Sequence, residues 1–354
     1  MQGLDIFSTC PQSRGQRQET YVQHVIDAAR WSEESGCTGM LVYADNGLVN
    51  PWLVSQVIIQ HTSSICPLVA LQPVYLPPYT AAKMVASLGF LHGRRLWLNM
   101  VAGGFPKDLV ALGDTTPHDV RYERLIEYVR IVQALLRGTE PVTFEGTYYR
   151  VHGLTMSPPL ARELVPEIVI SGSSSAGEAA ARTLGATPVA YPKPASEELA
   201  AASARDGGRR GIRVGIIARD DPEEAWRIAY ARFPDSRAGR ITHRLAMKMS
   251  DSQWHHELSA LETRPATPDD PYWLGPFQTS SSFCPYLVGS YMRVAQELAR
   301  YIAAGATMFI LDIPASREEL QHTMTTFGLA VAPANGGPVR DPPAGAREAE
   351  PYGV

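Results

Sequence analysis

The amino-acid sequence predicts an α/β protein built as a single (β/α)8 TIM barrel. Short apolar runs and helical patterns alternate eight times along the 354 residues. The apolar runs are continuous, as expected of parallel strands that are covered on both faces. A hydrophobic content of 45% allows a large core, and α/β barrels of this length routinely form one domain. The eightfold alternation therefore favours a closed barrel over a doubly wound sheet.

Each expected unit is a strand followed by a helix. The strands have the sequences LDIFSTC, GMLVYAD, PLVALQPV, RLWLNMVAGG, EIVISGSSS, ATPVAYP, IRVGIIARD and TMFILDI. The helices are expected over residues 20–35, 52–63, 79–92, 119–137, 174–184, 196–205, 222–233 and 316–327. Barrel enzymes place their active sites where the strands end. We therefore expect the polar turns YADNG, NMVAGG, SGSSS and YPKP to surround one mouth.

Two insertions interrupt the alternation. The stretch VTFEGTYYRVHG predicts a hairpin before the fifth strand, with Glu145 and Gly146 in its turn. Residues 235–289 are rich in Ser, Pro and Thr and predict an irregular, lid-like insertion before the eighth strand. The barrel is expected to span residues 1–330, and the Pro/Gly-rich tail 331–354 is expected to be disordered.

Composition excludes several classes of function. A net charge of −4 and a pI near 6.2 leave no basic patch for nucleic acid, and no apolar run is long enough for a membrane span. The adjacent His255, His256 and Glu257 lack the spacing of metal ligands on a helix, so we predict no metal site. No secretory signal is visible, and the cysteines are scattered without metal-ligand spacing: Cys10, Cys37, Cys66 and Cys284. These features predict a reduced, cytoplasmic protein.

The turn EIVISGSSSAG, residues 167–177, has two interpretations. It is either a loop with a serine N-cap or an anion site at the start of a helix. In the second case, Gly172 allows the backbone to approach closely, and Ser173 and Ser174 point hydroxyl and N–H groups at a phosphate. The turn by itself leaves both interpretations open.

Six stretches occur in the order found in the bacterial luciferase-like flavin-dependent monooxygenases: GCTGMLV, RRLWLNMVAGG, HDVRYERLIEYVRIVQALL, FEGTYYRVHG, PEIVISGSSSAGEAA and RDDPEEAW. The chain resembles this family over residues 1–330, and within it the alkanesulfonate monooxygenase group most of all. The resemblance implies reduced FMN (FMNH2) supplied by a separate NAD(P)H:flavin reductase, with molecular oxygen as co-substrate. It also implies a homo-oligomer, a dimer or a tetramer, that oxygenates a small organic substrate through a C4a-peroxyflavin.

The resemblance further implies roles for individual residues. The FMN phosphate would be held by Ser171, Gly172, Ser173 and Ser174. The flavin ring and its ribityl arm would be flanked by Asp45, Asn99, Ala102, His118 and Tyr122. His118 and Arg213 would be catalytic. Three of these residues have plainer alternatives, because His118 also suits the start of a helix, Tyr122 suits helix packing, and Asp45 suits a turn.

The substrate end departs from the family pattern. Arg213 is kept, but Gly215 stands at a family histidine, Ser280 at a lid arginine and Leu48 at a cysteine. The stretch ILDIPAS also lacks the family's tyrosine. A buried sulfonate needs several converging donors, so we predict that simple alkanesulfonates are poor substrates.

The altered positions predict an enlarged, more apolar pocket beside the single arginine, with Phe283, Tyr286 and Trp273 on the lid. An FMNH2-dependent monooxygenase acting on a larger organic substrate is the leading interpretation. The alternatives are an F420-dependent oxidoreductase on the same barrel, a plain alkanesulfonate monooxygenase, and a flavin-binding relative without turnover.

Overall fold

A closed barrel of eight parallel strands forms the centre of the protein. The structure is a computed structural model that describes residues 3–202, 208–249, 258–259 and 270–332. The barrel strands are β1 (Asp5–Thr9), β2 (Gly39–Val42), β3 (Cys66–Leu71), β4 (Trp97–Val101), β7 (Ile168–Ser171), β8 (Thr187–Ala190), β9 (Arg210–Arg219) and β12 (Ala306–Leu311). They pair in this order, and β12 closes the barrel by pairing with β1. The predicted fold and all eight predicted strands are confirmed.

Both faces of the barrel wall are buried. Apolar side chains from the strands fill the interior: Phe7, Leu41, Leu68, Trp97, Val169, Val189, Met308 and Ile310. The outward-facing strand residues pack against the surrounding helices in two larger clusters. Because each strand contributes apolar residues to both layers, the strand sequences are continuously apolar.

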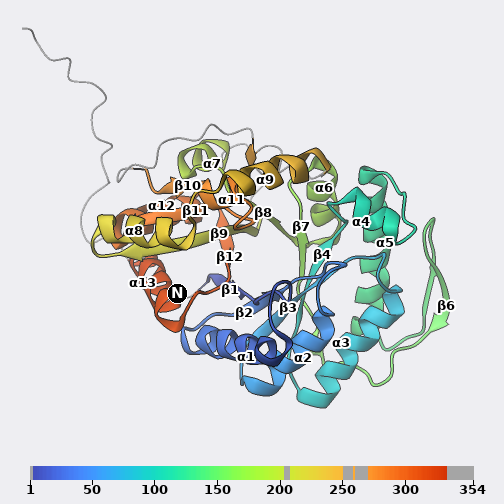
Figure 1. The fold of residues 1–354 in the computed structure, drawn as a ribbon. Coiled ribbons are helices and arrows are strands. Elements are labelled where there is room, and N and C mark those ends of the chain that lie inside the picture. Colours follow the sequence, from blue (N-terminus) through green and yellow to red (C-terminus); the bar gives the residue numbers. More distant parts are fainter. Residues whose placement is uncertain (1–2, 203–207, 250–257, 260–269, 333–354) are drawn as a thin grey trace, which may run out of the picture.

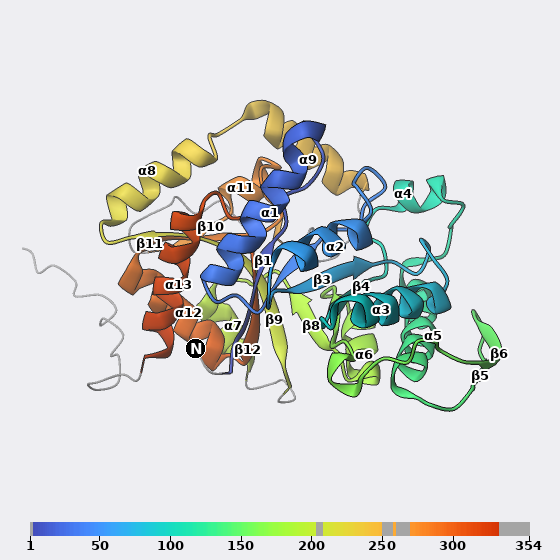
Figure 2. The ribbon, with the colours of Figure 1, turned by 90° about the horizontal axis from the view of Figure 1, so that it is seen from below.

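The helices surround the barrel (Figures 1 and 2). Those that match the predicted units are α1 (Gln18–Glu34), α2 (Pro51–His61), α3 (Pro78–His92), α5 (His118–Arg137), α6 (Ser175–Leu184), α7 (Ala195–Ala202), α8 (Pro222–Arg232) and α13 (Arg317–Val331). Local sequence explains several of their starts. Asn50 and Asp221 each accept a backbone N–H at a helix start with proline in the first position, and Ser316 caps α13.

The predicted hairpin is confirmed as β5 (Val142–Glu145) and β6 (Arg150–Leu154), which pair antiparallel. It projects from the barrel beyond α5 (Figure 1). Glu127 of α5 accepts the backbone N–H groups of residues 147–149, which fixes the turn against the helix.

The expectation that residues 235–289 are irregular is wrong for much of that segment. It contains α9 (Arg237–Met249), β10 (Tyr272–Trp273), α11 (Gly275–Gln278) and β11 (Tyr286–Ser290), and β11 leads into α12 (Tyr291–Ala303), which also was not predicted. A further short helix, α4 (Pro106–Ala111), follows β4. His255, His256 and Glu257, together with the tail from residue 333 onward, lie outside the described residues.

The unpredicted elements pack around β9, which extends beyond the barrel wall. Its first half pairs with β8 and β12, whereas residues 215–219 leave the barrel wall and pair in parallel with β11. A separate apolar cluster supports this extension and includes Trp226, Trp273, Phe277 and Tyr286. The extension therefore builds a small second core on one side of the barrel mouth.

None of the helices within the described ranges is long and apolar enough to cross a membrane.

Candidate functional site

A cavity of about 190 Å³ opens where the barrel strands end. Its buried walls come from strands around the whole barrel and include Leu41, Ala70, Asn99, Val189, Arg213 and Ile310. Exposed residues stand at its rim, namely Arg14, Asn46, Leu112 and Phe283. The predicted turns YADNG, NMVAGG and SGSSS all contribute to the wall, whereas YPKP contributes only Tyr191.

A smaller cavity of about 60 Å³ adjoins the first, since both are lined by Val101, Gly103, Gly104 and Ser171. It extends to the start of α6 and is also lined by Ala102, His118, Tyr122, Gly172, Ser173 and Ser174. The structure thus brings the residues predicted to bind a phosphate together in one recess, next to the larger cavity.

The serines of the SGSSS turn have different partners. Ser174 is the N-cap of α6, and its Oγ accepts the N–H of Gly177 at 3.2 Å, while Ser171 donates to Asn99 at 2.7 Å. Among the described residues, the buried Oγ of Ser173 has no hydrogen-bond partner. The capping interpretation therefore holds for Ser174, and Ser173 offers a free hydroxyl at the helix N-terminus, where an anion is stabilised.

Position 172 requires glycine, because a side chain there would be sterically strained. Its φ of +152° is rarely adopted by residues with a side chain, and a Cβ atom would lie 2.5 Å from the Tyr122 hydroxyl. The recess beside Ser173 is consequently lined by backbone, as a phosphate-binding turn requires. This open cradle and the unpartnered Ser173 hydroxyl fit a phosphate group.

The start of α5 forms the opposite wall of the smaller cavity. His118 holds its Nδ1 2.7 Å from Asp119, and its ring meets the buried Tyr122 edge-on at 5.3 Å between centroids. The preceding loop is fixed by Asp114, which accepts from the backbone and hydroxyl of Thr116 and pairs with Arg124 at 2.6 Å. Burial alone would raise the pKa of the Asp114 carboxyl, but the hydrogen bonds from Arg124 and Thr116 and the charge of Arg124 lower it to about 2.

Asp45 lies in a turn, as one of its two interpretations predicts, and its predicted contact with the flavin ring stays a prediction. It lines the larger cavity, yet it also pairs with Arg14 at 2.7 Å and accepts the N–H of Gly47. Its neighbour Asn46 accepts from Tyr75 and donates to the Asp108 carbonyl, which joins three loops of the mouth.

Arg213 is a buried cation in the wall of the larger cavity, with 6% of its surface exposed. Its guanidinium lies 4.9 Å from the ring centre of Tyr43, and its Nη1 reaches the Tyr191 hydroxyl at 3.5 Å. Its Nη2 lies 4.0 Å from the Asp312 carboxylate, and within the described part of the chain neither Nε nor Nη2 has a hydrogen-bond partner. These donors can receive an anionic or carbonyl oxygen from a ligand in the cavity.

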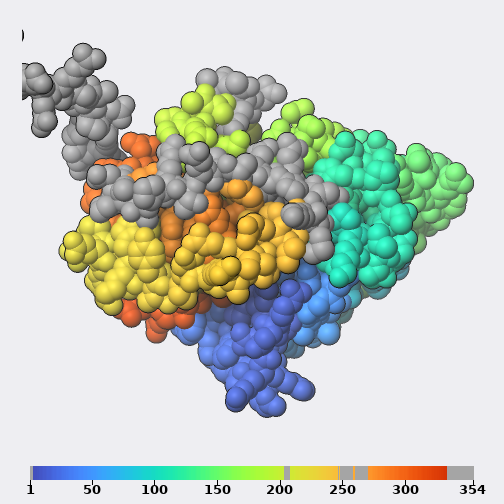
Figure 3. Space-filling model, turned by 45° about the horizontal axis from the view of Figure 1, so that its top comes forward, coloured from blue at the N-terminus to red at the C-terminus, as the bar shows by residue number. Residues whose placement is uncertain are grey.

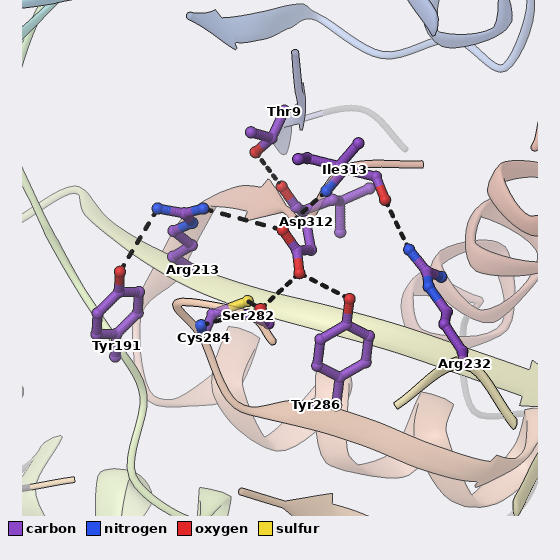
Figure 4. A network of polar contacts seen from close by, with 10 residues as sticks. Thr9, Tyr191, Arg213, Arg232, Ser282, Cys284, Tyr286, Asp312 and Ile313 are labelled. Atoms are coloured by element: carbon purple, nitrogen blue, oxygen red, sulfur yellow. Dashed lines mark hydrogen bonds and ion pairs between the residues drawn. The ribbon is translucent and has the colours of Figure 1, made fainter. Parts of the chain in front are cut away.

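Asp312, directly after β12, organises the contacts around Arg213 (Figure 4). Its Oδ2 accepts the hydroxyls of Ser282 at 2.5 Å and Tyr286 at 2.7 Å, and its Oδ1 accepts the N–H of Ile313. Burial and the facing carboxylate raise the pKa of Tyr286 well above its usual value, which keeps the hydroxyl a donor. Sequence reasoning missed Asp312, although a carboxylate at the end of a barrel strand is a signal of a site residue.

The expected enlargement of the substrate pocket is wrong at Gly215, Tyr286, Trp273 and Ser280. The Tyr286 ring fills the space beside Gly215, where a Cβ would lie 2.3 Å from it. Trp273 packs against Trp226 in the second core, away from the cavity. Phe283, 43% exposed, does line the cavity, as does Leu48, while the exposed Ser280 lies outside its wall.

Residues 3–308 match the model of the luciferase-like monooxygenase family. The chain is 35% identical over 306 residues to the 4-(gamma-L-glutamylamino)butanoyl-[BtrI acyl-carrier protein] monooxygenase BtrO of Niallia circulans, covering 85% of this chain and 89% of that protein. Its fold is similar to that of the long-chain alkane monooxygenase LadA, with a TM-score of 0.71 and 15% identity over 93% of this chain and 91% of the other. It is also similar to that of an F420-dependent secondary alcohol dehydrogenase, with a TM-score of 0.62 and 16% identity over 92% and 99%.

Proposed function

The chain belongs to the luciferase-like monooxygenase family, and from this premise we propose that it is the FMNH2-dependent oxygenase of a two-component system. Membership makes it a monooxygenase, hence an oxidoreductase, that works with a reduced flavin. The finer assignment concerns FMN as the flavin, a separate NAD(P)H:flavin reductase as its source, and a homo-oligomeric state.

The FMN phosphate is assigned to the recess at the start of α6. Ser173 and the backbone around Gly172 would bind it, with Ser171 and Ser174 holding the turn in place. This assignment is supported by the unpartnered Ser173 hydroxyl, which a ligand without a phosphate would leave unsatisfied.

The remaining flavin contacts are assigned around the junction of the two cavities. Asn99, Ala102 and Asp45 would flank the ring system, and His118 and Tyr122 would flank the arm that leads to the phosphate. Because Asp119 holds His118 Nδ1, the Nε2 atom is the one left to share a proton with a ligand in the smaller cavity.

When bound, reduced FMN supplies the electrons that activate molecular oxygen. The chain's own residues position the substrate and exclude water. Leu41, Val189 and Ile310 give the larger cavity apolar walls, and Arg213 donates from Nε and Nη2 to a substrate oxygen. Asp312 keeps that guanidinium in place through a carboxylate that Ser282 and Tyr286 also hold.

The substrate is proposed to carry a carboxylate or an acyl carbonyl that faces Arg213. This arginine carries the proposal, because it is the buried cation of the cavity wall and two of its donors await an acceptor. One arginine binds a carboxylate well but gives a sulfonate too few donors, so alkanesulfonates remain poor substrates. The similarity to the alkanesulfonate group then concerns the flavin-binding segments. The related BtrO acts on an acyl group, which agrees with this substrate class.

Anaerobic titration with reduced FMN and with reduced F420 tests the cofactor assignment. We expect tight binding of reduced FMN, weak binding of oxidised FMN and, when air is admitted, a transient absorbance band that free reduced FMN does not give. A preference for reduced F420 would identify a hydride-transferring oxidoreductase, and binding of reduced FMN without this band would identify a non-catalytic relative. Saturable sulfite release from alkanesulfonates, measured with any flavin reductase present, would contradict the substrate proposal.

A further inference from the structure

One helix at the barrel mouth carries a basic surface on an otherwise acidic protein. The sequence of α9, RAGRITHRLAMKM, contains several basic residues and no Asp or Glu, although the whole chain has a net charge of −4. Arg237, Arg240 and Arg244 are exposed, and their spacing of three and four residues places them on one face. Ile241 and Leu245 lie on that same face and are 42% and 55% exposed. We call these five residues the α9 face.

The opposite side of α9 is packed against the protein. The buried His243 ring contacts Phe277 of α11 edge-on at 4.8 Å, and Gly239 lies against the carbonyl of Thr279. The chain then continues from α11 to Phe283, which stands at the rim of the larger cavity. The α9 face is therefore anchored beside the opening through which a substrate enters.

The space-filling view agrees with this placement. Figure 3 shows the gold segment of α9 on the surface, between the yellow segment of α8 and the blue-green segment that includes α4. Asp108 and Leu109 of α4 line the same cavity, and Arg14 adds another exposed cation at its rim. Arg14 is paired with Asp45, so the positive charge on this side of the mouth comes mainly from α9.

We propose that the α9 face docks an acidic acyl-carrier protein, which presents the substrate as a thioester on an arm that enters the cavity. This inference rests on the proposed function and adds the form in which the substrate arrives. Exposed apolar residues among arginines match the composition of a transient interface, and its positive charge complements an acidic helix of the carrier. The acyl oxygen that Arg213 awaits would then lie at the end of the tether. The related BtrO acts on an acyl group held by such a carrier.

The test measures binding of the holo form of the BtrI acyl-carrier protein to the full chain at low and at physiological salt. The test variant is the double charge reversal Arg240→Glu/Arg244→Glu. The matched control is Arg150→Glu on the hairpin, since Arg150 is also an exposed arginine that is close to a glutamate. Arg240 pairs with the exposed Asp235 at the surface, so its replacement leaves the core intact. Thermal unfolding of each variant verifies this.

We expect the wild-type chain to bind the carrier in a salt-sensitive manner. The double variant should weaken binding about tenfold or more, while the control changes it less than about twofold. No detectable binding by the wild-type chain, or equal losses in the double variant and the control, would overturn the docking proposal.

Two further measurements separate this proposal from the proposed function. The double variant should bind reduced FMN as tightly as the wild-type chain does. If the wild-type chain binds the carrier but does not bind reduced FMN, the proposed function is contradicted and the docking proposal is not. The other partner that could use this face is the flavin reductase. If charge reversal weakens binding of the reductase but leaves carrier binding intact, the face serves the reductase and the carrier proposal is wrong.

Discussion

The proposed phosphate end and substrate end of the active-site region each contain a glycine next to a tyrosine. In both, the tyrosine occupies the space that a side chain at the glycine position would need. At the phosphate end, the space beside Gly172 is taken by the hydroxyl of Tyr122. At the substrate end, the space beside Gly215 is taken by the ring of Tyr286. The first pair keeps a recess open for a ligand, whereas the second pair closes a gap that a ligand would otherwise fill. The same residue combination thus has opposite consequences, depending on which part of the tyrosine faces the glycine.

The ends also differ in how their polar groups are satisfied. At the phosphate end, Ser171 donates to Asn99 of the neighbouring strand, Ser174 accepts from the first turn of α6, and the Ser173 hydroxyl has no partner among the described residues. At the substrate end, the buried guanidinium of Arg213 forms an ion pair with the Asp312 carboxylate, with 4.0 Å between Nη2 and Oδ1. A buried charge is far costlier to leave unpaired than a hydroxyl. Changes at the substrate end should therefore affect stability most, and changes at the phosphate end should affect ligand binding most.

The largest expected effect is that of Asp312→Ala. It removes the acceptor for Ser282 and Tyr286 and leaves Arg213 as an uncompensated buried charge, which should cost about 3–5 kcal/mol of unfolding free energy. Chemical denaturation measures this cost. Ser282→Ala is the control, because it removes one of these bonds and should cost only about 1–2 kcal/mol. Equal costs for the two variants would show that the carboxylate is not the centre of the network.

Gly215→Ala comes next and tests how closely the substrate end is packed. The added methyl group overlaps the buried Tyr286 ring, so we expect a loss of about 1–3 kcal/mol in denaturant unfolding. Combining it with Tyr286→Ala should cost less than the sum of the two single changes, because the overlap is relieved. Additive costs would mean that the ring does not fill this gap.

Asp114→Asn tests the loop that leads to His118 at the phosphate end. The lowered pKa of about 2, against an ordinary value of 3.8, corresponds to about 2 kcal/mol of stability at neutral pH. A carboxyl with a lowered pKa stabilises the fold above its unfolded-state pKa, and the contribution is lost as the pH falls from about 4 towards 2. The gap in unfolding free energy between variant and wild type should accordingly narrow between about pH 4 and pH 2. If the gap is constant over this range, the Asp114 carboxylate does not stabilise the loop through its charge.

The smallest expected effect separates the two adjacent serines of the phosphate turn. Ser173→Ala should weaken reduced-FMN binding about tenfold, because it removes a bond to a charged phosphate, and should leave riboflavin binding unchanged. Ser174→Ala instead removes the α6 cap and should cost about 1 kcal/mol of stability. Isothermal titration with FMN and with riboflavin measures these affinities. If Ser173→Ala weakens the binding of both flavins equally, the assignment of the FMN phosphate to this turn is wrong.

Most of the barrel was predictable because its signals are local. Each barrel strand is a continuous apolar run, and helix starts at Asn50, Asp221 and Ser316 use capping residues that are visible in the chain. The extension made by β11 and α12 was missed because the strand Tyr286–Ser290 follows a long stretch rich in Ser, Pro and Thr. Its partner, the second half of β9, reads in sequence as the end of an ordinary barrel strand.

The parts of the candidate site that are built from residues close together in the sequence could be predicted. By itself the sequence determined the barrel, the hairpin and the glycine–serine turn, since each depends on neighbours within a few positions of one another. Only the tertiary structure decided that Asp312 holds Arg213, that Tyr286 fills the space beside Gly215, and that α9 presents arginines at the mouth. The physical reason is that burial and electrostatic pairing depend on distance in space, and these partners come from strands and helices that the chain brings together only when the barrel closes.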